Sequence, residues 1–248
     1  MDKPKVLVGC PIFERAWILP KWLDALAAET ANVDLHVFFC MTQGKDKTGE
    51  IILQETTRGR FPVSTIPFEG GIEDHSRNWT DEERVKTIAA KRNKLLEAVA
   101  SVPHDYFLML DSDVIVSPGG VASLIDTIKF DGFDAVCPRV WVWNAFYVAG
   151  RYEKGRVALL PRRERGVHAV DVVTSSACMM VSRLSQDPAV RYGAAVRGRD
   201  FGWAPGHEVN GWNVSECIWW SKQAKAKTYR LGVNCNMTFD HRMTPAKI

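Results

Sequence analysis

Residues 106–110, Tyr-Phe-Leu-Met-Leu, form a short apolar run that ends in Asp111, Ser112 and Asp113. The run has the length of one buried β-strand. Two carboxylates at its tip would lie at the carboxyl edge of an α/β sheet, where open sheets of this kind bind ligands. Such carboxylates can hold Mg²⁺ or Mn²⁺ and leave positions free for phosphates. An isolated Asp-x-Asp is more often an acidic turn, so the neighbouring sequence has to decide.

A helix is predicted directly upstream of this strand. Apolar residues at 88, 89, 95, 96 and 99 fit one helical face. Arg92 and Asn93 belong to this helix and would lie beside the strand that carries the aspartates.

The order of helix, strand and Asp-Ser-Asp resembles nucleotide-sugar-dependent glycosyltransferases of the GT-A fold, whose helix often carries an Arg-Asn pair. Residues 6–15 resemble the opening strand and the Pro-x-Tyr-Asn-Arg type loop of family 2 members, and residues 36–40 resemble the second strand. Ser-Glu-Cys-Ile-Trp-Trp at 215–220 resembles the acidic helix start after the acceptor site. Asp240-His241 resembles the late histidine that completes many metal sites. Residues 85–138 also resemble fungal mannan-type mannosyltransferases.

Two positions depart from the family pattern. The second strand does not end in the Asp-Asp-Gly-Ser that is usual in family 2, so no acidic residue is assigned to the nucleobase. Glu216 is followed by Cys217 where an aspartate is common. The second departure concerns the residue that would act as catalytic base.

The resemblance implies an α/β fold: a GT-A, Rossmann-like mixed sheet flanked by helices in a single domain. Residues 1–138 would be the nucleotide-sugar and metal-binding half, and residues 139–248 the acceptor-binding half. A chain of 248 residues with 46% hydrophobic residues can bury one such core. No apolar stretch approaches the roughly 18 residues of a membrane span, and six cysteines form no Cys-x-x-Cys pair. We therefore expect a cytoplasmic protein with reduced core cysteines.

Sugar transfer from a diphosphate develops charge on both sides of the breaking bond, so the leaving group needs a cation and the acceptor hydroxyl needs a base. The resemblance implies a UDP- or GDP-linked sugar as donor, with Mn²⁺ or Mg²⁺. It assigns donor binding to Pro11, Phe13, Arg15, Arg92, Asn93, Asp111 and Ser112. It assigns the metal to Asp111, Asp113 and His241.

Three of these roles stay open on the sequence alone. Glu216 is the expected base, with Glu208 as its rival in the Trp-, Asn- and His-containing segment 203–216 that suits sugar binding. Arg92 pairs with the diphosphate, orients Asp111, or is an ordinary helix-surface arginine. His241 reaches the metal only if the end of the chain folds back.

The pattern along the rest of the chain predicts alternating strands and helices up to residue 138. Expected strands are 6–10, 35–40, 61–67, 134–138 and 172–181; expected helices are 16–29 and 119–129; 50–57 is ambiguous. A long loop is predicted at 69–79, closed by a capping box at 80–83. Apart from strand 172–181, residues 139–199 are predicted to be rich in loops.

The segment 139–199 is strongly basic, with eleven Lys and Arg against four Asp and Glu. This imbalance favours an anionic acceptor or surface, and a solvated Arg-rich hairpin at 161–166 explains it equally well. The acceptors expected are therefore a glycan or an anionic polymer, such as DNA with hydroxymethylated pyrimidines.

Two other classes of protein remain as alternatives. A metal-dependent nucleotidyltransferase also places carboxylates at a strand tip, but no Gly-rich phosphate loop follows the first strand. A non-catalytic nucleic-acid-binding protein would use the basic segment and its aromatic residues. It would not need Asp111, Asp113, Glu216 and His241 together.

Overall fold

The computed structural model describes residues 2–71, 81–142, 145–147, 149–154, 156–161, 163–204 and 214–242. Its helices are α1 (Leu19–Glu29), α2 (Thr48–Arg58), α3 (Glu82–Val99), α4 (Gly120–Asp131), α5 (Ser182–Ser185) and α6 (Glu216–Ala226). Its strands are β1 (Lys5–Ile12), β2 (Asp34–Met41), β3 (Val63–Pro67), β4 (Tyr106–Leu110), β5 (Val114–Ile115), β6 (Ala135–Val142), β7 (Ala145–Tyr147), β8 (Gly150–Glu153), β9 (Arg156–Leu159), β10 (Val167–Val170), β11 (Ala177–Val181), β12 (Ala195–Val196), β13 (Val214–Ser215) and β14 (Leu231–His241).

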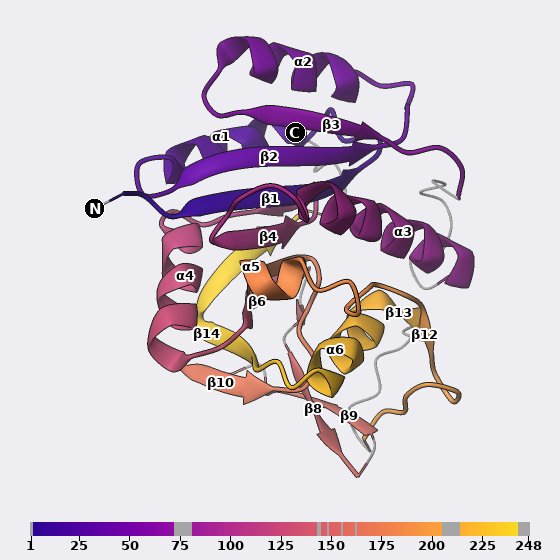
Figure 1. Cartoon of the computed structure of the whole chain (residues 1–248). Helices are drawn as coiled ribbons and strands as arrows, with labels where there is room; N and C mark the ends of the chain where they lie inside the picture. Colours follow the sequence, from indigo (N-terminus) through magenta and orange to yellow (C-terminus); the bar gives the residue numbers. More distant parts are fainter. Residues whose placement is uncertain are drawn as a thin grey trace.

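One mixed sheet forms the centre of the molecule (Figure 1). Its strand order is β10-β14-β6-β11-β4-β1-β2-β3, with β5 and β7 attached at its side. Strands β4, β1, β2 and β3 run parallel, whereas β11 lies antiparallel between β4 and β6. Strand β14 runs parallel to β6, so β1, β4 and β14 all point the same way. Their carboxyl ends therefore meet at one edge of the sheet.

Helices cover both faces of this sheet, and each face has its own apolar core. The first core joins α1, α2 and α4 to alternate strand residues such as Leu108 and Leu110 of β4. The second joins α3 and α6 to the intervening residues, such as Phe107 and Met109. Because side chains alternate along a strand, β4 is buried on both sides, which explains its continuous apolar sequence. The fold is the helix-flanked mixed sheet expected from the resemblance.

The first half of the chain follows the sequence prediction closely. The ambiguous segment 50–57 is helical, within α2. The helix expected from residue 16 begins only at Leu19, because Arg15 O accepts from the N–H groups of both Ile18 and Leu19 in a preceding turn. Pro20 then occupies the first helical turn, where its missing N–H costs no bond.

The prediction of a loop-rich segment over 139–199 missed several short strands. The described part of this segment contains the end of β6 and the short strands β7 to β12. The strand expected at 172–181 covers only β11, and Val172 instead forms an isolated bridge with Gly150. These strands are two to five residues long, too short for local periodicity to reveal them. Two of them, β10 and β11, also pair with strands far away in the sequence.

The N-terminus of α3 has a side-chain cap. The capping residue is Asp81, whose carboxylate accepts from the N–H groups of Glu83 and Arg84. The loop expected at 69–79 and Thr80 lie largely outside the described residues.

Among the helices described, none is both long and apolar enough to cross a membrane.

Candidate active site at the carboxyl edge of the sheet

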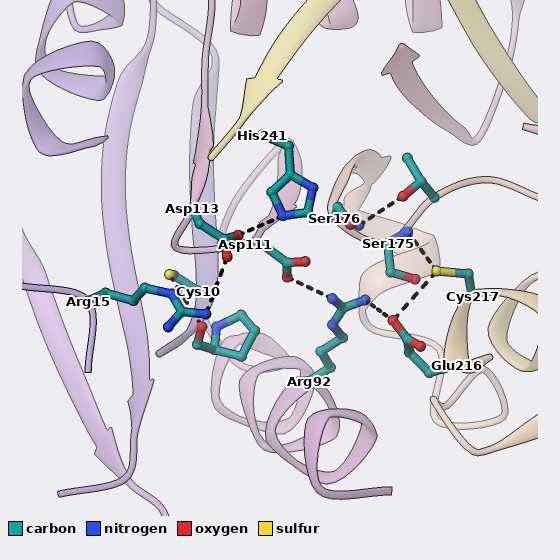
Figure 2. A network of polar contacts seen from close by, with 12 residues as sticks. Cys10, Arg15, Arg92, Asp111, Asp113, Ser175, Ser176, Glu216, Cys217 and His241 are labelled. Atoms are coloured by element: carbon teal, nitrogen blue, oxygen red, sulfur yellow. Dashed lines mark hydrogen bonds and ion pairs between the residues drawn. The ribbon is translucent and has the colours of Figure 1, made fainter. Parts of the chain in front are cut away.

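Polar side chains from five segments meet where β1, β4 and β14 end (Figure 2). Asp111 and Asp113 follow β4, Arg15 follows β1, and His241 is the last residue of β14. Arg92 reaches the same place from α3, and Glu216 from the first turn of α6. The chain end does fold back, as the prediction for His241 required.

Asp113 lies between two basic side chains. Its Oδ1 is 3.1 Å from His241 Nε2, and its Oδ2 is 3.3 Å from Arg15 Nη2. Burial alone would raise the pKa of Asp113, but His241 and Arg15 outweigh it and lower the pKa to about 2. Burial likewise disfavours the imidazolium of His241, yet Asp113 raises the pKa of His241 above 6.5. Asp113 is therefore ionised at every physiological pH.

Asp111 is held by a different partner. Arg92 Nη2 donates to Asp111 Oδ1 over 2.7 Å, and the Arg92 side chain is only 2% exposed. Burial raises the pKa of Asp111; Arg92 opposes this shift, and the charge of Asp113 adds to it. On the α1 side, Trp22 Nε1 donates to Asp111 O over 3.0 Å. The structure thus supports the reading in which Arg92 orients Asp111, and it excludes a surface arginine.

Arg92 also connects Asp111 to Glu216. Arg92 Nη1 is 3.1 Å from Glu216 Oε1, so one buried guanidinium faces two carboxylates. Ser215 caps α6 by accepting the N–H of Ile218, and this places Glu216 at the first position of the helix. A carboxylate is stabilised there by the helix dipole. The expected base is consequently fixed beside the aspartates and not elsewhere in the acceptor half.

Cys217 stands where an aspartate is common in the family. Its Sγ accepts the N–H of Ser175 over 3.2 Å and lies 3.5 Å from Glu216 Oε1. Burial raises the pKa of Cys217 to about 12, with a further contribution from Glu216. The thiol therefore stays protonated at neutral pH and does not act as a base itself.

Asn93 makes contacts of a structural kind. Its Nδ2 donates to Tyr192 O over 3.0 Å, and its Oδ1 accepts the Tyr192 N–H over 2.7 Å. Both ends of the amide thus bind one backbone unit and hold the segment before β12 against α3. Tyr192 in turn places its ring 5.5 Å from the Arg92 guanidinium carbon. The role of Asn93 in donor binding stays a prediction.

The other expected donor residues lie around the end of β1. Pro11 is in β1 and Phe13 follows it, both half-buried, whereas Ser112 is buried between the two aspartates. Sequence reasoning missed Lys91, which is 2% exposed, donates to Ile12 O over 3.1 Å and lies 6.0 Å from the Phe13 ring. The sequence does not indicate that Lys91 is buried, because a lysine at this position of a helix is ordinarily exposed to solvent.

Glu208, the rival base, lies outside the described residues. Among those described, no three His, Cys, Asp or Glu side chains are gathered as a ready metal site. The reason is visible in the contacts: Arg92 holds Asp111, whereas Asp113 pairs with His241 (Figure 2). A carboxylate and an imidazole nevertheless form a donor pair that suits Mn²⁺, and two protein ligands leave positions for phosphate oxygens. The Asp113–His241 pair therefore fits a divalent cation by its chemistry.

We predict that Mn²⁺ affinity rises with pH and reaches a plateau above the pKa of His241. A protonated imidazole cannot bind a metal. Because Asp113 raises the pKa of His241 from its usual 6.5, protons still compete with the metal at pH 6.5. Titration of the protein with Mn²⁺ across this range measures the effect. His241→Gln should bind more weakly and lose this pH dependence; a wild-type protein with a flat profile would contradict the assignment.

We predict that Arg92→Met lowers the free energy of unfolding by about 3 kcal/mol or more, since it leaves two carboxylates without their buried partner. The loss should be smaller at acidic pH. Without Arg92, burial and the charge of Asp113 raise the pKa of Asp111 further, so the variant recovers stability as the pH falls and Asp111 takes up a proton. Urea denaturation at two pH values measures both effects. Arg58→Met, at an exposed position in α2, is the control, and an equal loss in both variants would refute the prediction.

A comparison with family models matches residues 71–185 to Glycosyl transferase family 2. This segment is a little less than half of the chain and contains Arg92, Asp111 and Asp113. No curated protein sequence matches the chain.

Solved structures share the fold over nearly the whole chain. The structure of S. aureus TarS 1-349 in complex with UDP-GlcNAc has 14% sequence identity and a TM-score of 0.61, covering 98% of this chain and 62% of that one. Mannosyltransferase PcManGT from Pyrobaculum calidifontis, in complex with GDP-Man and Mn²⁺, has 11% identity and a TM-score of 0.58, covering 99% and 58%. The chain thus spans about three fifths of the length of these structures.

The family match includes the strand tip and its helix, and the shared fold extends from β1 to β14. Both agree with the resemblance seen in the sequence. The chain therefore shares the fold of these glycosyltransferase structures, and its residues 71–185 match the Glycosyl transferase family 2 model.

Proposed function

We propose that this protein transfers a sugar from a nucleoside-diphosphate sugar to an acceptor hydroxyl, in a reaction that depends on Mn²⁺ or Mg²⁺. The observation that carries the proposal is the single network at the carboxyl edge of the sheet. It contains a carboxylate–imidazole pair, Asp113 and His241, and a second carboxylate, Glu216, joined to the strand tip through Arg92 and Asp111.

The two ends of this network suit the two demands of sugar transfer. Asp113 and His241 would hold the cation, which neutralises the charge that develops on the leaving diphosphate. Arg15, which already pairs with Asp113, would add a positive charge on the β1 side. Glu216 would take the proton of the acceptor hydroxyl, and its contact with Arg92 keeps its carboxylate beside Asp111.

Asp111 connects these two ends. Its carboxylate is oriented by Arg92 and its carbonyl by Trp22, so its position is set from both faces of the sheet. We assign it a role in holding the donor between the cation and the base. Such preorganised charge is the largest contribution to catalysis in many enzymes.

The donor class is supported by the structures of similar fold, which were solved with UDP-GlcNAc and with GDP-Man and Mn²⁺. We accordingly propose a UDP- or GDP-linked sugar. A glycan or an anionic polymer such as DNA remains the predicted acceptor.

The test is to incubate the protein with UDP-GlcNAc and with GDP-mannose, with Mn²⁺ or with a chelator, and to identify the released phosphate compound. We expect slow release of nucleoside diphosphate that requires the metal, because water can replace a missing acceptor. Release of pyrophosphate would indicate the nucleotidyltransferase alternative. If neither donor binds or reacts under any metal condition, the proposal fails.

A further inference from the structure

A cavity of about 550 Å³ lies away from the carboxylate network, at the β10 side of the sheet. Three arginines, a cysteine and an asparagine line it. These residues are Arg139, Arg163, Arg165, Cys235 and Asn236. Its volume falls within the range of small-molecule sites.

Three segments build this cavity. Arg139 comes from β6, and Arg163 and Arg165 come from the connection between β9 and β10. Cys235 and Asn236 come from β14, where the pairing with β6 shifts between Asn234 and Thr238. Residues 235–237 of β14 therefore have no partner in the β6 ladder, as at a β-bulge, and two of them line the cavity.

The arginine-bearing connection is fixed onto β14 by its last residue. Gly166 O accepts the N–H of Cys235 over 2.8 Å, and Gly166 N–H donates to Asn236 Oδ1 over 2.9 Å. Gly166 has φ +86°, a conformation that other residues adopt only with strain. Because Asn236 Oδ1 accepts from Gly166, the side-chain NH₂ group of Asn236 is the part that can donate a hydrogen bond to a ligand. The wall is thus preorganised, with an amide donor beside the guanidinium groups.

Among the described residues that line this cavity, three carry a positive charge and none carries a negative one. Glu164 lies between two of the arginines, but its carboxylate is 3.3 Å from His168 Nε2, and its carbonyl accepts from Arg139. Three guanidinium groups in one hollow suit a phosphate, which carries about two negative charges at neutral pH, better than a carboxylate with one. Arginine binds such oxyanions through paired N–H groups.

The cavity shares its strands with the proposed catalytic site. Arg139 pairs with Thr238 in the β6–β14 ladder, and His241 follows Thr238 by three residues, about 10 Å along the strand. Cys235 belongs to the apolar core that also contains α6 residues, and α6 begins with Glu216. One residue that lines the cavity therefore packs on the face of the sheet that α6 covers.

We infer that this arginine-lined cavity is an acceptor subsite that binds a phosphate group of the acceptor, with Arg163, Arg165 and Arg139 as its ligands. The inference rests on the proposed function, because it treats the bound group as part of the acceptor. It gives the basic segment a defined role: a phosphorylated sugar unit anchored in the cavity can extend toward the transfer site.

Calorimetry with three probes of matched size tests this inference. Glucose 6-phosphate, glucuronate and glucose differ mainly in their charge. They are titrated in the presence of Mn²⁺ and a saturating nucleoside diphosphate, so that the proposed metal and nucleotide sites are already occupied. We expect glucose 6-phosphate to bind about tenfold or more tightly than glucuronate, given the strength of charged hydrogen bonds, and glucose to give no measurable binding.

The double variant Arg163→Gln/Arg165→Gln should reduce glucose 6-phosphate affinity at least about tenfold. Arg58→Gln, which removes the same kind of charge from α2 at the other end of the sheet, should leave it unchanged. Equal affinity in the double variant, or phosphate binding no tighter than that of glucose, would overturn the inference. Tighter binding of glucuronate than of glucose 6-phosphate would overturn the choice of phosphate.

A second titration separates this inference from the proposed function. Mn²⁺-dependent nucleoside diphosphate binding is measured in the same three proteins. If the nucleotide binds normally and glucose 6-phosphate does not, the subsite is wrong and the glycosyltransferase proposal stands. If the nucleotide does not bind to the wild type even with Mn²⁺, the result contradicts the proposed function itself.

Discussion

Asp113→Asn is expected to abolish Mn²⁺-dependent binding of the donor nucleotide. The carboxylate of Asp113 is ionised down to a pKa of about 2, because His241 and Arg15 overcome the effect of burial. Asparagine has nearly the same volume but no charge, so the fold should remain while the cation loses its anionic ligand. We expect the loss to exceed the roughly 10–100-fold that follows removal of an outer-shell partner. Calorimetric titration with UDP or GDP, with and without Mn²⁺, measures it.

Asp240→Asn is the matched control for this experiment. Asp240 precedes His241 in β14, and its Oδ2 accepts from Arg242 Nε over 2.6 Å, outside the Asp113 pair. It carries the same charge at nearly the same place, so a general electrostatic effect would appear in both variants. Equal nucleotide affinity in wild type and Asp113→Asn would remove the metal from this strand tip.

Glu216→Gln is expected to retain donor affinity and to lower turnover by about 10²–10⁴, the usual contribution of a general base. Glutamine can still accept a hydrogen bond from Arg92 through its carbonyl oxygen, so Asp111 should keep its position. Only the ability to take a proton is lost. Steady-state kinetics and nucleotide titration on the same sample separate these two quantities.

Glu208→Gln is the comparison variant for the base. If Glu208→Gln loses turnover and Glu216→Gln does not, the base is Glu208. If neither variant is slowed, the acceptor hydroxyl must lose its proton to another group, such as the departing phosphate. The contact between Arg92 and Glu216 favours the first expectation, since it keeps Glu216 next to Asp111.

The strand tip was predictable because its signals are local. An apolar run that ends in Asp111 and Asp113, preceded by a helix that carries Arg92, is enough to place three of the site residues on one edge of a sheet. His241 was reachable only through the family resemblance. Its pairing with Asp113 spans more than a hundred residues and depends on β14 running parallel to β6, which no local pattern encodes.

Other parts of the site arise from packing alone. Trp22 lies within the helix expected at 16–29, and its Nε1–H donates to the carbonyl of Asp111. Lys91 and Asn93 lie on α3 at positions that would be solvent-exposed on an isolated helix, but the loop after β1 and the segment before β12 cover them. Sequence periodicity predicts which face of a helix is apolar; it does not predict which polar residues tertiary contacts will bury.

The basic segment shows the same limit. Its charge was evident from composition, and the two readings, an anionic partner or a solvated hairpin, had equal weight. The structure brings Arg139 of β6 next to Arg163 and Arg165 of the connection between β9 and β10. Their meeting depends on the shifted pairing of β14 with β6, so the cavity was not predictable from the sequence.

The most direct test of the account is a pulsed electron paramagnetic resonance measurement on Mn²⁺ bound to the protein together with a nucleoside diphosphate. We predict that the same ion shows coupling to ³¹P of the nucleotide and to one ¹⁴N of an imidazole, and that the ¹⁴N coupling disappears in His241→Gln. Coupling to phosphorus without any nitrogen in the wild type would show that the metal and donor bind away from the Asp113–His241 pair, and it would contradict the proposed active site.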